Sequence, residues 1–439
     1  MSIQKSISYS LFILVILLTN TATRAQEKLS LLDAIDVALK NNYGIRIAQL
    51  EKEVAYQNNT WGNAGAMPTL SLNATGAGFT TDNQASFLRN RLTGTLSTNL
   101  SWTLFDGLAM FANKQQLNLL ENLSSGNAAV IVENTVQGVI LAYNNILVAS
   151  EQEKTLLQSL AISKDRLAYQ EFRKDLGATG TFELLQFKDA VLTDSANLLT
   201  QRININNAYR NLNLLMGVDI ASVYTLIDTL SEEFEEFSYR SMRKKMLSSN
   251  QTLMNQFMTN RLRAQELKSF KAQQLPSLNL NASSSYITGR FGLSNGETRN
   301  TTGVLEYSAN LTLSFNIYNG DETRRQVEVA KINTFIADMQ EKDLRNSLEN
   351  DLLTAYDTYQ QLLQTLDIRK AAVENANQNL EIATERFQSG LINSLDFRDI
   401  QAQFLTANFN KYQTIRDLKE IETELIRLTG GLLQQPEKE

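Results

Sequence analysis

The chain has 439 residues, a net charge of −6, and neither cysteine nor histidine. Without cysteine, a disulfide framework, a thiol nucleophile and a lipid-modified amino-terminal cysteine are excluded. Without histidine, ordinary zinc or copper sites and Ser-His-Asp catalysis are excluded as well, so we expect neither an enzyme nor a bound cofactor. No Lys/Arg cluster stands out, which argues against a nucleic-acid-binding protein.

The first 25 residues have the pattern of a secretory signal peptide. Lys5 provides the positive charge, residues 11–18 form a short apolar core, and Ala25 is the small residue that signal peptidase prefers. The apolar core is too short to anchor the chain in a bilayer, and no later stretch approaches 18 consecutive apolar residues. We therefore predict that the mature chain leaves the cytoplasm and contains no transmembrane helix.

The remaining sequence is internally duplicated. Segments around Gly107, Gly177 and Gly217 return 213 residues later, and Pro68 returns as Pro276. Repeats of this kind mean that two similar halves share one architecture. We predict a first repeat over 26–217, a linker over 218–249, a second repeat over 250–430, and a polar tail over 431–439.

Each repeat begins with helical patterning, which in the first repeat breaks near Asn41 and Asn42, and continues with a predicted strand pair. The pairs cover residues 68–106 and 276–319 and end near Gly107 and Gly320. Apolar and small polar residues alternate along these strands, which is typical of transmembrane β-barrel strands but also of a half-buried soluble sheet. Four such strands behind a signal peptide favour the barrel. The alternation assigns the following residues to lipid: Leu100, Trp102, Leu311 and Leu313. It assigns the following residues to the lumen: Asn99, Ser101, Asn310 and Thr312.

Four strands are too few to close a barrel, because small barrels need about eight. An open sheet edge in lipid would leave backbone groups unsatisfied. The chain must therefore pool its strands with copies of itself. Two, three or four copies would give 8, 12 or 16 strands, and the strand count alone does not choose among them.

Long helices follow each strand pair, over 108–216 and 321–429. About 65 residues without proline, at ~1.5 Å per residue, make a helix of roughly 100 Å. Apolar residues recur at the spacing of a coiled-coil seam, as in Val136, Val139, Tyr143 and Ile146. Gly177 and Gly390 mark the predicted helix-to-helix turns, and the return helices end at Gly217 and Gly430. Helices of this length suit a bridge across the periplasm.

The second turn carries acidic residues where a helix begins. Residues 390–396 predict a turn followed by an N-cap, with Asp396 in the first helical turn. Asp399 follows three residues later and therefore shares one helical face with Asp396. One interpretation is stabilisation of the helix dipole, and the other is a functional pair of carboxylates at the end of a channel.

Taken together, residues 31–42, the two strand ends and the segment 386–401 closely resemble the TolC-type outer-membrane efflux protein family. The resemblance covers essentially the whole mature chain and implies a mainly α fold with β-structure. Three copies would form a 12-stranded β-barrel in the outer membrane and a 12-helix tunnel in the periplasm. The implied function is passive exit of substrates in efflux or type I secretion. The implied partners are a periplasmic adaptor protein and an inner-membrane transporter.

The resemblance also implies site residues at the periplasmic tip. Family members carry acidic residues six and nine positions after the tip glycine, where they form constricting rings, and Asp396 and Asp399 occupy these positions. The adaptor would dock on the turns, for which we predict the following residues: Gly177, Thr181, Arg386, Gly390 and Ser394. Some members latch the closed tip with an Arg and a Tyr, where this chain has Ile392 and Phe387. Arg386 or Arg398 is the substitute that we expect.

Two other functions compete with the channel. A trimeric coiled-coil scaffold or surface structural protein would explain the helices, but it would not need matched pairs of alternating strands. A carboxylate hydrolase using Asp396 and Asp399 is the weakest alternative, because these residues lie on one helix face without the signature of a pocket.

Overall fold

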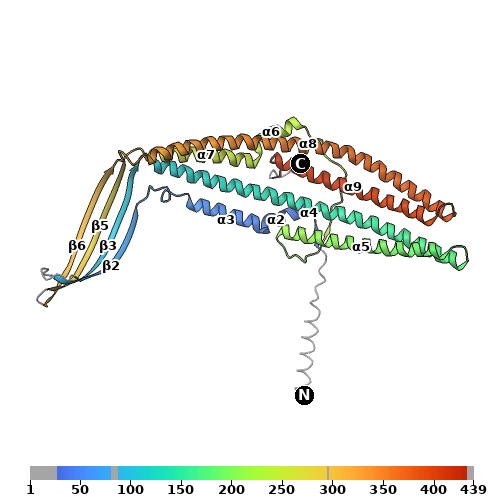
Figure 1. Ribbon diagram of the computed structural model, residues 1–439, viewed down its shortest axis with the longest axis horizontal. Coiled ribbons are helices and arrows are strands. Elements are labelled where there is room, and N and C mark those ends of the chain that lie inside the picture. Colours follow the sequence, from blue (N-terminus) through green and yellow to red (C-terminus); the bar gives the residue numbers. More distant parts are fainter. Residues whose placement is uncertain (1–26, 81–87, 294–295, 433–439) are drawn as a thin grey trace, which may run out of the picture. The chain divides into compact units, whose positions relative to one another are not determined.

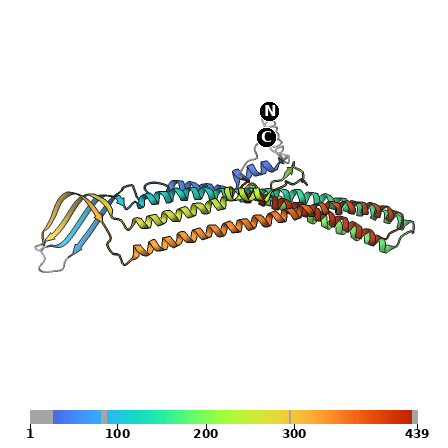
Figure 2. The ribbon, with the colours of Figure 1, turned by 90° about the horizontal axis from the view of Figure 1, so that it is seen from above.

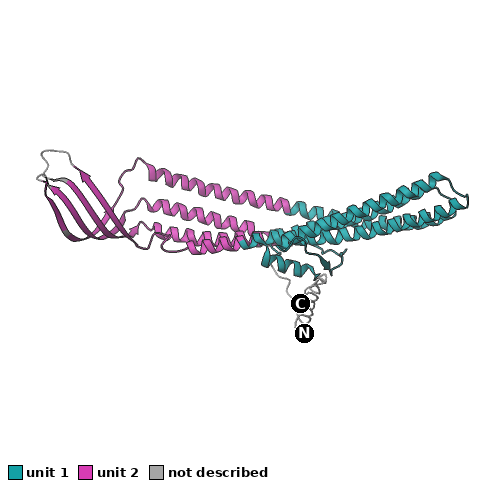
Figure 3. Cartoon of the chain, turned by 90° about the horizontal axis from the view of Figure 1, so that it is seen from below, with its two compact units in different colours: residues 1–46, 132–242, 352–439 teal, residues 47–131, 243–351 magenta. Residues whose placement is uncertain are grey.

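The computed structural model describes residues 27–80, 88–293 and 296–432 (Figure 1). The predicted signal peptide and residues 433–439 of the predicted tail lie outside the described residues. The described chain is mostly helical with some sheet, as expected. It forms two compact units, coloured separately in Figure 3. Unit 1 comprises residues 1–46, 132–242 and 352–439, and unit 2 comprises 47–131 and 243–351. Each unit draws on both sequence repeats, so the contacts group the chain differently from the repeats.

Unit 2 contains a four-stranded antiparallel sheet. Its strands are β2 (Thr69–Thr80), β3 (Leu88–Asp106), β5 (Ser277–Leu293) and β6 (Thr298–Ser314), in the order β2-β3-β5-β6. The last strand ends at Ser314, which makes it shorter than the predicted range to residue 319. Ser314 pairs with Ser277, the first residue of β5. Pro276 precedes it and has no N–H to extend the ladder.

The two faces of this sheet differ in chemistry. The register places Asn310 opposite Asn281, and Leu311 opposite Leu280, so polar and apolar residues keep to separate faces. On the polar face the Ser283 and Ser308 hydroxyls are 2.8 Å apart. On the apolar face Leu311 is 63% exposed. A face of large exposed apolar side chains needs a non-aqueous environment or a partner.

The helices of unit 2 continue the order of the strands. They are α3 (Tyr43–Asn58), α7 (Gln251–Ala272) and the first parts of α4 (Ala109–Asp175) and α8 (Glu322–Gln388). Side-chain hydrogen bonds join neighbouring elements in three places: Lys114 to Asn59, Asn255 to Asn127, and Gln256 to the Ala337 carbonyl. The lateral order is therefore α3, α4, α7, α8, as Figure 2 shows for this part of the chain.

The junction between β3 and α4 requires a glycine. Gly107 has a φ of 70°, and a Cβ there would lie 2.2 Å from the Ala272 carbonyl oxygen. The next residue, Leu108, also has a left-handed φ of 75°. Gly320 and Asp321, 213 residues later, share these left-handed angles at the start of α8.

Unit 1 contains α2 (Leu31–Asn41), α5 (Thr181–Met216), α9 (Ser394–Leu428) and the later parts of α4 and α8. Asn42 separates α2 from α3, as predicted. Ser30 and Asp33 form a capping box at the start of α2. The predicted seam of α4 is confirmed, because the following side chains are buried: Val136, Val139, Tyr143 and Ile146.

The segment 218–249 contacts the helices of unit 1 through short elements. It contains β4 (Tyr224–Leu226), which pairs in parallel with β1 (Glu27–Leu29), and α6 (Tyr239–Ser249). Asp228 accepts hydrogen bonds from the Tyr143 hydroxyl at 2.7 Å and from the Leu31 N–H at 2.8 Å. Glu232 accepts a 3.0 Å ion pair from Lys411. Over the described residues, each helix is too short or too polar to span a bilayer.

Candidate functional site

The first predicted turn joins α4 to α5 through Gly177. The chain there has the hydrogen bonds of a Schellman motif, from Gly177 N–H to the Lys174 carbonyl and from Ala178 N–H to the Arg173 carbonyl, both 2.8 Å. Gly177 has a φ of 70°. Thr181 is the first residue of α5, and its side chain is exposed. Gly177 and Thr181 therefore lie at the end of one antiparallel helix pair.

The second predicted turn joins α8 to α9 through Gly390, whose φ is 72°. The Leu391 N–H donates to the Arg386 carbonyl at 2.8 Å, and Arg386 itself is exposed. The N-cap of α9 is Asn393, whose side-chain oxygen accepts from the Asp396 N–H at 2.9 Å. Ser394 is only 3% exposed, and its hydroxyl bonds to Gln186 of α5. Ser394 thus holds the two turns together from inside.

Asp396 and Asp399 lie in the first two turns of α9, and both side chains are exposed. Their neighbours Phe397 and Ser394 are buried, so the two carboxylates point away from the packed face of the helix. Negative charge near a helix N-terminus is favourable, which explains part of the acidic pattern. The structure brings the two predicted carboxylates onto one open face.

The position where some relatives carry a latching Tyr holds Phe387, and this ring is buried. It packs against Phe187 of α5 and Phe397 of α9, with ring centroids 5.3 Å and 5.2 Å apart. Nearby, the Tyr169 hydroxyl of α4 donates to the Gln388 carbonyl at 3.0 Å. An apolar cluster therefore joins the two helix pairs at this end of unit 1.

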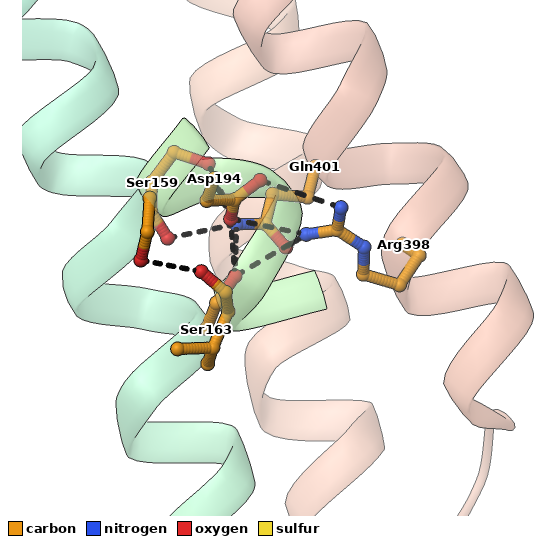
Figure 4. Close-up of polar contacts among 7 residues, drawn as sticks. Ser159, Ser163, Asp194, Arg398 and Gln401 are labelled. Atoms are coloured by element: carbon orange, nitrogen blue, oxygen red, sulfur yellow. Dashed lines mark hydrogen bonds and ion pairs between the residues drawn. The ribbon is translucent and has the colours of Figure 1, made fainter. Parts of the chain in front are cut away.

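Further along the same helices, a buried polar cluster joins α4, α5 and α9 (Figure 4). Asp194 of α5 is 2% exposed and accepts a hydrogen bond from the Ser163 hydroxyl at 2.6 Å. Arg398 of α9 pairs with the same carboxylate at 3.3 Å. The fully buried Gln401 donates to the Ser159 hydroxyl at 2.8 Å and accepts from Arg398 at 2.9 Å. We call these five residues the Asp194 cluster.

The cluster satisfies a charge that would otherwise be costly. A buried carboxylate must be paired and hydrogen-bonded, and Asp194 has a cation and a hydroxyl donor for this purpose. Arg398, one of the two expected latch residues, is the cation, and its side chain is 27% exposed. The sequence reasoning missed the other four residues. A signal was present, because Asp194 interrupts an apolar seam formed by Phe187, Ala190 and Leu198.

Comparison with known proteins supplies the family. The model of the outer membrane efflux protein family matches residues 34–218 and 242–431. The chain belongs to the outer membrane efflux protein family. It is 22% identical over 385 residues to the outer membrane protein TolC of Escherichia coli K12, covering 84% of this chain and 76% of that protein.

Solved channels share the fold of this efflux protein. The Campylobacter jejuni CmeC outer membrane channel has a TM-score of 0.78 and 17% identity, covering 93% of this chain and 87% of CmeC. The open state of the Neisseria gonorrhoeae MtrE channel has a TM-score of 0.73 and 17% identity, covering 92% of this chain and 89% of MtrE.

Family membership gives this efflux protein its general role. It is an outer-membrane efflux channel with a large periplasmic part, and the family consists of passive channels rather than enzymes. The uncovered apolar face of its sheet suits lipid, and the small polar side chains of the other face suit a water-filled interior.

Proposed function

We propose that three copies of this chain close one 12-stranded barrel and one 12-helix tunnel. The observation that carries the proposal is the sheet of unit 2, which has an even number of antiparallel strands and two open edges, β2 and β6. Because the edge strands run in opposite directions, β6 of one copy can pair with β2 of the next in an antiparallel ladder. Cyclic repetition removes every edge, as lipid requires.

In this assembly the chain serves as a passive exit duct for efflux or type I secretion. The polar face of the sheet would line the pore with small side chains, and the apolar face would meet lipid. The repeats give each copy two similar helix pairs, so three copies contribute six pairs around one axis. Transport energy would come from an inner-membrane transporter.

The periplasmic end of the duct would be its gate. Threefold symmetry turns Asp396 and Asp399 into two stacked rings of three carboxylates. Their exposure on the monomer supports this arrangement, since a buried carboxylate could not face a pore. Narrow acidic rings favour cations over anions.

An adaptor protein would dock on the two turns. The surface there is formed by Gly177, Thr181, Arg386 and Gly390, with Ser394 supporting it from beneath. Large apolar side chains are exposed beside these residues, and they are Phe172, Leu176, Phe182 and Leu391. Exposed apolar residues next to polar ones are typical of a protein-binding surface.

Arg398 would hold the tip closed in place of the latch that some relatives have. It connects α9 to α4 and α5 through Ser163 and Asp194. Release of this contact would let α9 move with its two aspartates. Arg386 is exposed at the turn, which suits adaptor docking better than a latch.

The test is reconstitution of the full-length mature protein. Detergent-extracted protein should fractionate with the outer membrane, have the native mass of a trimer, and conduct ions in a planar bilayer. A trimer without conductance would support the scaffold instead, and a soluble monomer would exclude both functions.

A further inference from the structure

Two helix faces in unit 2 are apolar and have no partner among the described residues of the chain. On α3 the face is formed by Ile47, Leu50 and Val54, with Leu50 67% exposed. On α8 it is formed by Val329, Ile332, Ile336 and Met339, with Met339 56% exposed. The spacing of three and four residues places each set on one side of its helix.

The opposite sides of these helices are the ones that pack within the chain. Ala48 of α3 and the residues Val327, Ala330 and Ala337 of α8 are buried. Lateral order explains the difference, because α3 and α8 lie at the two ends of the row α3, α4, α7, α8. Each end helix has a neighbour in its own chain on one side only.

These end helices connect to the two open sheet edges. Residues 59–68 join α3 to β2, and residues 315–321 join β6 to α8. A second copy that pairs its β2 with β6 therefore also brings its α3 beside α8. We propose that the α3 face of one copy packs against the α8 face of the next and forms an apolar helical seam. This inference rests on the ring of copies proposed above.

The heights of the two faces agree. Asn59 contacts Lys114 and Glu121 of α4, Asn127 contacts Asn255 of α7, and Asn260 contacts Glu341 of α8. Counting along antiparallel helices from these contacts, at ~1.5 Å per residue, places Val54 at the height of Ile336. Leu50 comes to the height of Met339. Rotation about an axis along the helices preserves height, so these pairs face each other across the seam.

The absence of cysteine makes this seam directly testable. The variants V54C/I336C and L50C/M339C should form intermolecular disulfides on oxidation of membrane-embedded protein. Non-reducing gels should then show covalent dimers and trimers that disappear on reduction. Each single-cysteine variant should run as a monomer, because a threefold axis keeps identical residues apart.

A register control uses the same two faces. The variant I47C/I332C places its cysteines about 11 residues apart in height, or ~16 Å, which exceeds the Cα separation that a disulfide spans. It should remain unlinked. If the protein has a trimeric native mass but neither matched pair links, or the control links more readily, the seam is wrong and the trimer stands. A monomeric native mass would overturn both. A disulfide within one chain would show as a faster-running monomer and would also overturn the seam.

Discussion

Glu133 places a carboxyl group in the core of unit 1, where its side chain is 4% exposed. Burial raises the pKa of this carboxyl, and the nearby Arg427 opposes the rise only in part. A group whose folded-state pKa lies above its unfolded value favours the folded state when protonated. Its contribution to stability is therefore lost as pH increases from the ordinary carboxyl range through the raised pKa.

We predict that Glu133→Gln increases the thermal unfolding midpoint at pH 8 and reduces the loss of stability between acid and neutral pH. The amide keeps the shape of the side chain without the cost of a buried charge. Thermal unfolding of purified protein at several pH values measures both effects. Glu381→Gln, at an exposed position of α8, is the matched control and should leave the profile unchanged. A decrease in stability at pH 8 would show that the contact with Arg427 outweighs burial.

The two aspartates of α9 permit a second prediction at the residue scale. Asp396→Asn combined with Asp399→Asn should reduce cation selectivity and relieve block by di- and trivalent cations in planar-bilayer recordings. Trimer stability should change little. If the residues only stabilise the helix start, selectivity stays constant and stability falls by a few tenths to ~1 kcal/mol. Unchanged selectivity and block in a folded double variant would remove both residues from the gate.

At the scale of elements, the Asp194 cluster fixes how α9 packs on α4 and α5. Asp194→Ala should destabilise the protein by about 3 kcal/mol, at the low end for breaking a buried pair because Arg398 can turn towards solvent. Asp194→Leu combined with Arg398→Met should recover much of the loss, since apolar residues of similar volume often replace buried pairs. Denaturant unfolding measures both. Equal destabilisation by the single and double variants would mean that the ion pair itself is not what holds α9.

The sheet gives the other prediction at this scale. Leu311→Arg should impair assembly by about 2–4 kcal/mol if the residue faces the middle of the bilayer, whereas Asn310→Arg on the opposite face should assemble and change conductance. The yield of trimer after refolding measures the first effect, and bilayer recordings measure the second. The two positions are adjacent and differ only in the face they occupy. Equal tolerance at both would contradict the assigned faces.

At the scale of the whole molecule, strong periodicity made most elements predictable. The alternation after Pro68 and Pro276, the break at Asn42 and the seam around Tyr143 all appear in the structure as predicted. The Asp194 cluster could not be derived in the same way. Its residues lie on three helices up to 242 positions apart, and each alone has the pattern of an ordinary polar residue on a long helix. The end of β6 was also missed, because it depends on where its partner β5 begins.

The two open sheet edges also determine how a defective copy would act among normal ones. A ring made of three chains closes only if every chain offers both edges, so one copy with a blocked β2 or β6 can enter an assembly and prevent its closure. With equal amounts of normal and blocked chains that mix at random, only about one ring in eight would contain normal chains alone. Damage to an edge strand should therefore be dominant in cells that express both forms. Loss of the whole chain from one of two gene copies should be recessive.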